Sequence, residues 1–383
     1  VTYGEAGNDD IGNLTSLDYY TIDHYRETTA MIPGTITDQT LKFERNKQLN
    51  TGLDLSLFGN RIFMTADWFS ITTEDLLVYE PQPAFLGFSL VPTNNGELTN
   101  RGWELSLYSR ILNYKKLKGE VTFHMAGFQN RVEAIQNDAV VTPFPGGYFI
   151  SRVSDPVLSF YGYRFLGVYA TQDEAENDGL VTGKGVPFGA GDARFEDVYG
   201  PEGTPDGVIN ELDRVILGSP IPELYGGATA TVRYGRWSVS ANLQIVTGQE
   251  VFNYIRYQDE KMTDLSNQST NTLSRWTHEG QETDVPRALY NDPVGNSEFS
   301  SRWIEDGSYI RVKNVTLAYR IPQQLWLLRN LEVFATATNL YTWTKYLGYD
   351  PEFSFSYSAL DQGIDYGLMP HTKSYILGVR IGL

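Results

Sequence analysis

The chain has 383 residues, with 47 Asp or Glu against 30 Lys or Arg, so its formal net charge is −17. This acidic balance argues against nucleic-acid binding, which requires a basic surface, and we expect no nucleic-acid partner. The absence of cysteine excludes disulfides, cysteine zinc sites and thiol nucleophiles. No apolar run approaches the roughly 18 residues of a membrane-spanning helix, whereas a membrane-spanning strand needs only about 9–11 residues that alternate.

Alternation of apolar and polar side chains is the dominant pattern along the chain. In 222–235, for example, Leu224 and Val232 share one parity while Thr229 and Thr231 take the other. A strand with this pattern has one apolar and one polar face. The parity changes between Val312 and Val315, which predicts a β-bulge. The alternating segments are 48–58, 62–68, 97–112, 118–134, 222–235, 237–245, 305–321, 330–343 and 375–383.

Short and long connections follow one another strictly along the chain. This asymmetry is typical of transmembrane barrels, which have short periplasmic turns and long extracellular loops. We therefore predict an all-β fold, a transmembrane antiparallel β-barrel to which this chain gives about ten strands. Residues 158–170 look strand-like, but we assign them to one large extracellular excursion over 135–221. The short connections lie near 59–60, 113–117, 234–236 and 322–330, and the long ones near 5–47, 79–96, 135–221, 256–304 and 345–370.

Aromatic side chains recur near the predicted strand ends. Amphipathic rings favour the membrane interface, which makes these residues candidates for aromatic girdles. Ordinary sheet packing is the alternative, because aromatics are enriched in all strands. The candidates are Tyr79, Tyr108, Tyr114, Tyr254, Tyr319, Tyr341, Trp343 and Tyr346.

The segment 202–213, EGTPDGVINELD, is the strongest candidate for a metal site. Its oxygen-bearing side chains fit the spacing of an EF-hand-like calcium loop, with Gly207 at the sharp turn. The alternative is an Asp-Gly turn capped by carboxylates. The predicted calcium ligands are Glu202, Asp206, Asn210 and Asp213.

The predicted loops are rich in aromatic residues, which can stack on sugar rings or pack against peptide side chains. Packing of the loops against one another explains them equally well, so no substrate residue is assigned. We expect no enzyme, because the sequence has no nucleophile elbow or P-loop and no cofactor signature other than the calcium loop. The loop aromatics are Phe85, Phe88, Phe144, Tyr148, Phe149, Tyr161 and Tyr163.

Several motifs, in this order, resemble the C-terminal barrel of SusC/RagA-like TonB-dependent outer-membrane transporters of Bacteroidota. The resemblance covers nearly all of residues 1–383, although an insertion of about four residues separates Asp197 from Asp206 in the family's acidic loop, and Leu383 stands where such barrels usually end in an aromatic. The motifs are VTYGEAGNDDIGN at 1–13, LKFERNKQLNTGLDLSLFGNRIFMTADWF at 41–69, NRGWELSL at 100–107, GDARFEDVYGPEGTPDGVINELDRVILGSPIPELYGG at 191–227, RWIEDGSYIRVKNVTLAYRIP at 302–322 and LEVFATATNLYTWTKYLG at 331–348.

The resemblance implies a barrel of about 22 strands around a plug, of which this chain is the C-terminal part. It implies an outer-membrane location with extracellular loops, and contact with membrane lipid and lipopolysaccharide. The implied function is import of an oligosaccharide or peptide, driven by the TonB complex through a plug outside this chain, with a SusD-like surface lipoprotein as lid. The remaining strands would complete the barrel. Two alternatives stay open: a barrel recruited as a structural subunit without transport, and a soluble β-rich glycan-binding protein.

Overall fold

The fold is known from a computed structural model that describes most of the chain. The chain divides into two compact units, residues 1–141 with 151–157 and residues 142–150 with 158–383. The C-terminal Leu383 and the loop aromatics Phe85 and Phe88 lie outside the described residues. The described residues are 1–8, 19–25, 28–35, 41–81, 90–322, 330–353, 356 and 358–382.

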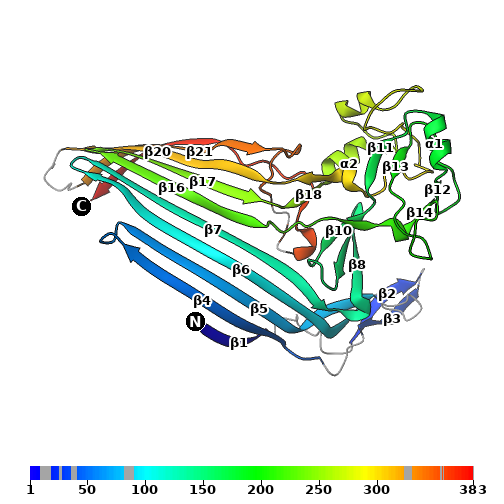
Figure 1. The fold of residues 1–383 in the computed structure, drawn as a ribbon, viewed down its shortest axis with the longest axis horizontal. Helices are drawn as coiled ribbons and strands as arrows, with labels where there is room; N and C mark the ends of the chain where they lie inside the picture. Colours follow the sequence, from blue (N-terminus) through cyan, green and yellow to red (C-terminus); the bar gives the residue numbers. More distant parts are fainter. Residues whose placement is uncertain are drawn as a thin grey trace. The chain divides into compact units, whose positions relative to one another are not determined.

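Ten long strands form one antiparallel sheet, as the alternation predicts. Five of them belong to the first unit, where consecutive long strands lie side by side (Figure 1). Their order is β1 (Thr2–Asn8), β4 (Glu44–Leu57), β5 (Ile62–Pro81), β6 (Leu90–Tyr114) and β7 (Leu117–Ala134). The other five belong to the second unit, in the order β16 (Leu224–Tyr234), β17 (Trp237–Thr247), β20 (Tyr309–Ile321), β21 (Asn330–Thr344) and β23 (Ser374–Gly382).

In the second unit, one face of the sheet carries exposed apolar side chains in register. Val232 pairs with Val239, which pairs with Leu317, and the row continues through Ala335 to Leu377. Val239 is 44% exposed and Leu377 is 84% exposed. Apolar rows that no other part of the described chain covers suit a hydrocarbon environment, and they exclude a water-soluble core built on this face.

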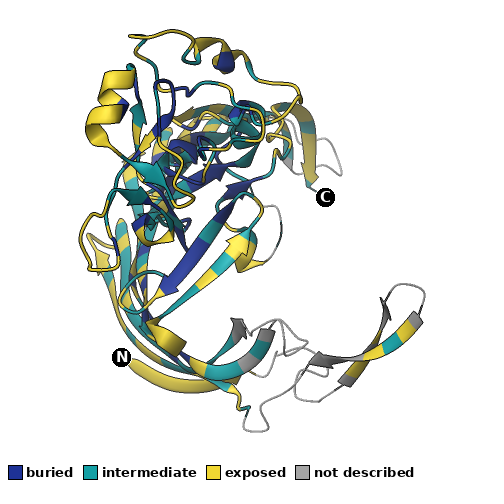
Figure 2. Cartoon of the chain, turned by 90° about the vertical axis from the view of Figure 1, so that its right-hand side faces the viewer, coloured by how far each residue is buried: buried dark blue, intermediate teal, exposed yellow. Residues whose placement is uncertain are grey.

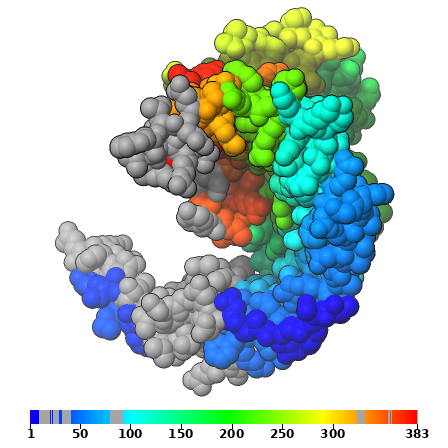
Figure 3. Space-filling view, turned by 90° about the vertical axis from the view of Figure 1, so that its left-hand side faces the viewer, coloured from blue at the N-terminus to red at the C-terminus, as the bar shows by residue number. Residues whose placement is uncertain are grey.

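The first unit repeats this arrangement. Leu53 pairs with Ala66, and the row continues through Leu105 to Met125. The space-filling view shows β4 to β7, coloured blue to cyan, as adjoining bands of one surface (Figure 3). Both units therefore present the one-sided strands that the sequence predicts.

The predicted bulge lies at Lys313. The pairing of β20 with β17 shifts there, and its pairing with β21 shifts between Val312 and Asn314. On β21, Asn339 has a left-handed φ of 51°, which Asn tolerates better than most residues. The parity change in the sequence is thus confirmed as a real change of register.

Smaller elements occupy the long connections, and residues 158–170 give two short strands to sheets other than the long one. Buried side chains, dark blue in Figure 2, concentrate among these elements. Among the described residues, no helix is long and apolar enough to cross a membrane. The smaller elements are β2 (Tyr19–Tyr25), β3 (Thr28–Thr35), β8 (Ala139–Phe144), β9 (Gly147–Arg152), β10 (Ser159–Gly162), β11 (Phe165–Val168), α1 (Gln172–Asp178), β12 (Val181–Thr182), β13 (Ala193–Phe195), β14 (Val208–Ile209), β15 (Val215–Gly218), β18 (Glu250–Asn253), α2 (Tyr254–Glu260), β19 (Ile304–Asp306) and β22 (Ile364–Asp365).

The predicted girdle aromatics separate into two groups. Tyr114, Tyr341 and Trp343 are exposed by more than half of their surface, as interfacial rings require. The prediction is wrong for Tyr346, which is buried and donates a hydrogen bond of 2.6 Å to Asp365. It is also wrong for Tyr254, which packs on the aromatic core of the loops. The side chain of Tyr79 lies outside the described residues.

Candidate functional site

The second face of the sheet in the second unit is polar, and its side chains bond across strands. Asn242 on β17 donates to Thr229 on β16 at 2.8 Å. The hydroxyls of Thr316 and Thr336 lie 2.8 Å apart across β20 and β21. Because these side chains hydrogen-bond to one another, none of these polar atoms lacks a partner, and the face is suited to contact with water.

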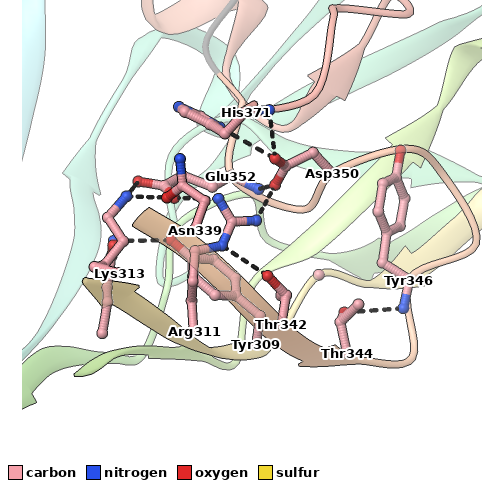
Figure 4. Close-up of polar contacts among 12 residues, drawn as sticks. Tyr309, Arg311, Lys313, Asn339, Thr342, Thr344, Tyr346, Asp350, Glu352 and His371 are labelled. Atoms are coloured by element: carbon pink, nitrogen blue, oxygen red, sulfur yellow. Dashed lines mark hydrogen bonds and ion pairs between the residues drawn. The ribbon is translucent and has the colours of Figure 1, made fainter. Parts of the chain in front are cut away.

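A cluster of charges lies on this polar face, where the bulge turns β20 (Figure 4). The Arg311 guanidinium forms ion pairs with Asp350 and Glu352, and its Nε donates to Thr342 at 2.8 Å. The Nζ of Lys313 lies 2.7 Å from the Glu352 carboxylate. The cluster fastens the connection between β21 and β23 to β20.

Asp350 is the central acceptor of this cluster. Its carboxylate also accepts from the main-chain N–H of His371 at 3.0 Å and lies 3.1 Å from His371 Nδ1. Burial alone would raise the pKa of Asp350, but hydrogen bonds from Arg311 and from the main-chain N–H groups of Glu352 and His371 hold that pKa below its ordinary value. The Asp350 carboxyl is therefore ionised at neutral pH.

Sequence reasoning did not single out these five residues as a cluster. The signal was present, because Arg311 and Lys313 have the same parity as the outward-facing Leu317. The bulge reverses that parity, so both cations reach Glu352 on the polar face. Arg311, just before the bulge, and Lys313, at the bulge, thus mark where this strand carries charge on the polar face.

The predicted calcium ligand Asp213 is fully buried, and its carboxylate is occupied by main-chain donors. Its Oδ1 accepts from the N–H groups of Val198 at 2.8 Å and Tyr199 at 3.1 Å. Its Oδ2 accepts from the N–H of Asn210 at 2.8 Å, which closes a capping box. Asp213 therefore holds the loop together by main-chain hydrogen bonds.

The other three predicted ligands do not converge on Asp213. Asp206 accepts from the N–H of Val208 at 3.0 Å, Asn210 accepts from the N–H of Leu212 at 2.9 Å, and Glu202 is exposed. In the part of the chain that is described, no three His, Cys, Asp or Glu side chains gather closely enough to hold a metal ion. The residues as arranged do not fit a calcium coordination sphere, and calcium binding stays a prediction.

The loop aromatics form two cores. Phe149 and Phe160 are fully buried in one of them and stack with ring centroids 5.1 Å apart, with Phe144 packed against them. Tyr163 is buried in the other, beside Phe195. For Phe144, Phe149 and Tyr163 the packing alternative therefore holds, and these rings are not surfaces for cargo.

The one-sided strands define a membrane β-barrel wall, and the polar face defines its interior. A family model described as "TonB dependent receptor-like, beta-barrel" matches residues 1–340. The chain belongs to this family, which confirms the resemblance drawn from its motifs, and the barrel fold of this family implies the outer membrane.

Several known proteins match most or all of the chain. The TonB-dependent receptor P3 of Formosa agariphila is 29% identical over 400 residues, covering 100% of this chain and 39% of the relative. The TonB-dependent receptor SusC of Bacteroides thetaiotaomicron is 24% identical over 90% of this chain and 32% of SusC. A solved structure of the RagAB peptide transporter matches with a TM-score of 0.81 at 24% identity, over 99% of this chain and 40% of that one. The chain thus spans about two fifths or less of the length of these relatives.

Proposed function

We propose that the protein containing this chain imports an oligosaccharide or peptide across the outer membrane. In this proposal a plug outside the chain couples to the TonB complex, a SusD-like surface lipoprotein closes the extracellular side, and further strands complete the barrel. Membrane lipid and lipopolysaccharide surround the wall. The chain itself acts as wall and binding surface and catalyses no reaction.

The observation that carries the proposal is the contrast between the two faces of the sheet. The row through Val239, Leu317 and Leu377 is apolar and exposed, whereas the neighbouring row through Asn242, Thr338 and Ser374 is polar and hydrogen-bonded. A wall that is apolar outside and polar inside separates lipid from a wet interior, as a solute pathway requires.

The long connections support a role for the extracellular side. The excursion over 135–221 and the segment after β17 contain the two buried aromatic cores. Structured loops of this size can shape a cargo site and receive a lid. The name of the related RagAB structure, a peptide transporter, is in keeping with import.

Purification and uptake together test the proposal. A tagged full-length protein is purified from outer membranes in mild detergent, and cargo uptake is compared in cells with and without TonB. Import predicts that a surface lipoprotein co-purifies and that uptake requires TonB. A barrel recruited as a structural subunit predicts no lipoprotein lid and no TonB-dependent uptake, and either result would overturn the proposal.

A further inference from the structure

A cavity of about 640 Å³ lies within the second unit. Its walls come from β11, from the turn at Thr270–Ser274, from residues 283–285 and from Arg256 on α2, and Arg302 also lines it. The lining includes the polar side chains of Asn271, Ser274 and Thr283 beside the ring of Phe165. An aromatic ring among hydroxyl and amide groups suits a polar ligand that has one apolar face.

Arg302 is the unusual member of this lining. Its side chain is only 4% exposed, yet its Nε and Nη2 have no hydrogen-bond partner among the described residues. Its guanidinium stacks on Trp303, 4.2 Å from the ring centroid. Burial, with the charge of Arg256 nearby, lowers the pKa of Arg302 to about 10, which leaves it charged at neutral pH. A buried, charged group without acceptors is costly, and such an exception calls for a missing partner.

Glu260 does not supply that partner. The nearest distance between them, from Arg302 Nη2 to Glu260 Oε2, is 3.9 Å, which is too long for a hydrogen bond. The Glu260 carboxylate already accepts from Arg256 at 3.3 Å, from Asn271 at 3.0 Å and from Ser269 at 3.1 Å. Glu260 thus makes its hydrogen bonds elsewhere and meets Arg302 only as a long ion pair.

A second arginine of the same unit shows what the edge of a guanidinium that carries Nε and Nη2 can bind. Arg287 uses its Nε and Nη2 to hold both carboxylate oxygens of the buried Asp192, each at 2.8 Å. In Arg302, which lines the cavity, the same two nitrogens are buried and have no hydrogen-bond partner among the described residues. The parallel N–H groups on Nε and Nη2 match the two oxygens of a planar carboxylate.

We propose that this cavity binds the carboxylate of an acidic sugar in the cargo, with Arg302 as the residue that pairs with it. The inference rests on the proposed function and names its cargo class. A small rotation of the guanidinium presents the Nε–Nη2 edge to the ligand. The exposed carboxylate of Asp284 also lines the cavity, where it can accept hydrogen bonds from the several hydroxyl groups that each sugar ring carries.

Direct binding to the purified full-length protein tests this assignment without any uptake measurement. The probes are a tetrasaccharide of glucuronic acid, the matching neutral tetrasaccharide of glucose and a tetraglutamate peptide, each titrated by calorimetry. We expect the acidic sugar to bind more tightly than both others. In Arg302→Gln the Kd of the acidic sugar should rise at least about tenfold. In Arg302→Lys part of the affinity should return, because lysine keeps the positive charge but lacks the two parallel N–H donors of the guanidinium.

Thermal unfolding separates this role from a structural one. Arg302→Gln removes a buried charge whose Nε and Nη2 make no hydrogen bond and whose ion pair with Glu260 is long, so the Tm without ligand should stay equal or rise. The matched variant Arg287→Gln breaks a buried pair and should lower the Tm. Tighter binding of tetraglutamate would overturn the sugar assignment, and equal binding of the acidic sugar by the wild type and Arg302→Gln would overturn the site. If the acidic sugar binds but cells do not take it up, the binding site at Arg302 is supported and import is refuted.

Discussion

Val239, Leu317 and Leu377 on the long strands keep 44, 45 and 84% of their surface exposed, whereas Phe149, Phe160 and Trp303 in the loops keep none. The strands therefore leave their apolar groups for lipid to cover, and they join through main-chain pairing and polar side-chain bonds. The loops make an aromatic core of the kind found in water-soluble domains. One chain thus combines two ways of using apolar residues, and each way responds differently to substitution.

The largest expected effect comes from a substitution that disrupts the aromatic core of the loops. Phe160→Ala removes a fully buried ring that contacts Phe144, Phe149 and Phe299, and we expect a loss of about 3–5 kcal/mol in local stability. Hydrogen exchange of the loops measures it. Val239→Ala, on the exposed face of β17, is the matched control and should change stability by less than about 1 kcal/mol. Equal effects of the two substitutions would contradict the comparison.

The next prediction concerns the fastening of a loop to the sheet. Arg311→Gln leaves the buried Asp350 without its main ion-pair partner, which should cost about 3 kcal/mol. Proteolysis within the connection between β21 and β23 should increase. Lys313→Gln is the control, because Lys313 is more exposed and pairs only with Glu352, and it should have a smaller effect. Faster proteolysis in the control than in Arg311→Gln would refute this role.

The lipid-facing surface can be probed directly. Leu317→Arg places a charge among the exposed apolar residues of β20 and should cost about 2–4 kcal/mol if that residue lies near the bilayer midplane. Thr316→Arg, its neighbour on the polar face, should fold and insert nearly as well as the wild type. Urea unfolding in lipid vesicles measures both. A greater loss for Thr316→Arg would mean that the two faces have been assigned the wrong way round.

The acidic loop offers a smaller effect and a test of calcium. Asp213→Asn turns an acceptor for the Asn210 N–H into a donor, which should cost about 1–3 kcal/mol. If hydrogen bonds alone organise the loop, the loss is the same in calcium and in EDTA. A calcium-dependent rise in Tm that disappears in Asp213→Asn would establish the metal site instead.

The smallest prediction is a pH dependence in the loops. Burial, with Asp306 nearby, raises the pKa of Glu250 from 4.5 to about 7. The folded state then favours the protonated acid, so this contribution to stability is complete below about pH 4.5 and is lost as the pH rises through 7. Because Glu250 is only half buried, we expect a loss below about 2 kcal/mol. Glu250→Gln should flatten the profile between these pH values, and an unchanged slope would exclude Glu250 as its source.

The strands and the bulge could be predicted because each depends on a local period of two. The parity of Val232, Val239 and Leu317 determines which face they share, and the change after Val312 marks the bulge. The charged cluster could not be predicted in the same way. Arg311 and Asp350 are 39 residues apart, and only the path of the connection between β21 and β23 brings them together.

The loops were predicted less well for a related reason. Phe144 and Phe149 are aromatic residues of the kind that stack on sugars, and the sequence alone does not distinguish a ring that faces solvent from one that faces another ring. Tyr346 was misassigned to the membrane interface because its place near a strand end gave no sign of its bond to Asp365. The cavity at Arg302 left no periodic signal, since its lining comes from five separate segments.

The single extra residue in β20 has a consequence for how such a wall can evolve. In a regular strand, Arg311 and Lys313 would point the same way as Leu317 and meet hydrocarbon. Removing Lys313 would make Val312 and Asn314 consecutive and would leave Arg311 opposite Gln244 on the polar side. Smoothing out the bulge with Lys313 kept would instead turn Arg311 to the lipid side without changing its identity. The way the strand accommodates one extra residue, rather than its composition, thus determines on which side of the membrane wall a positive charge is displayed.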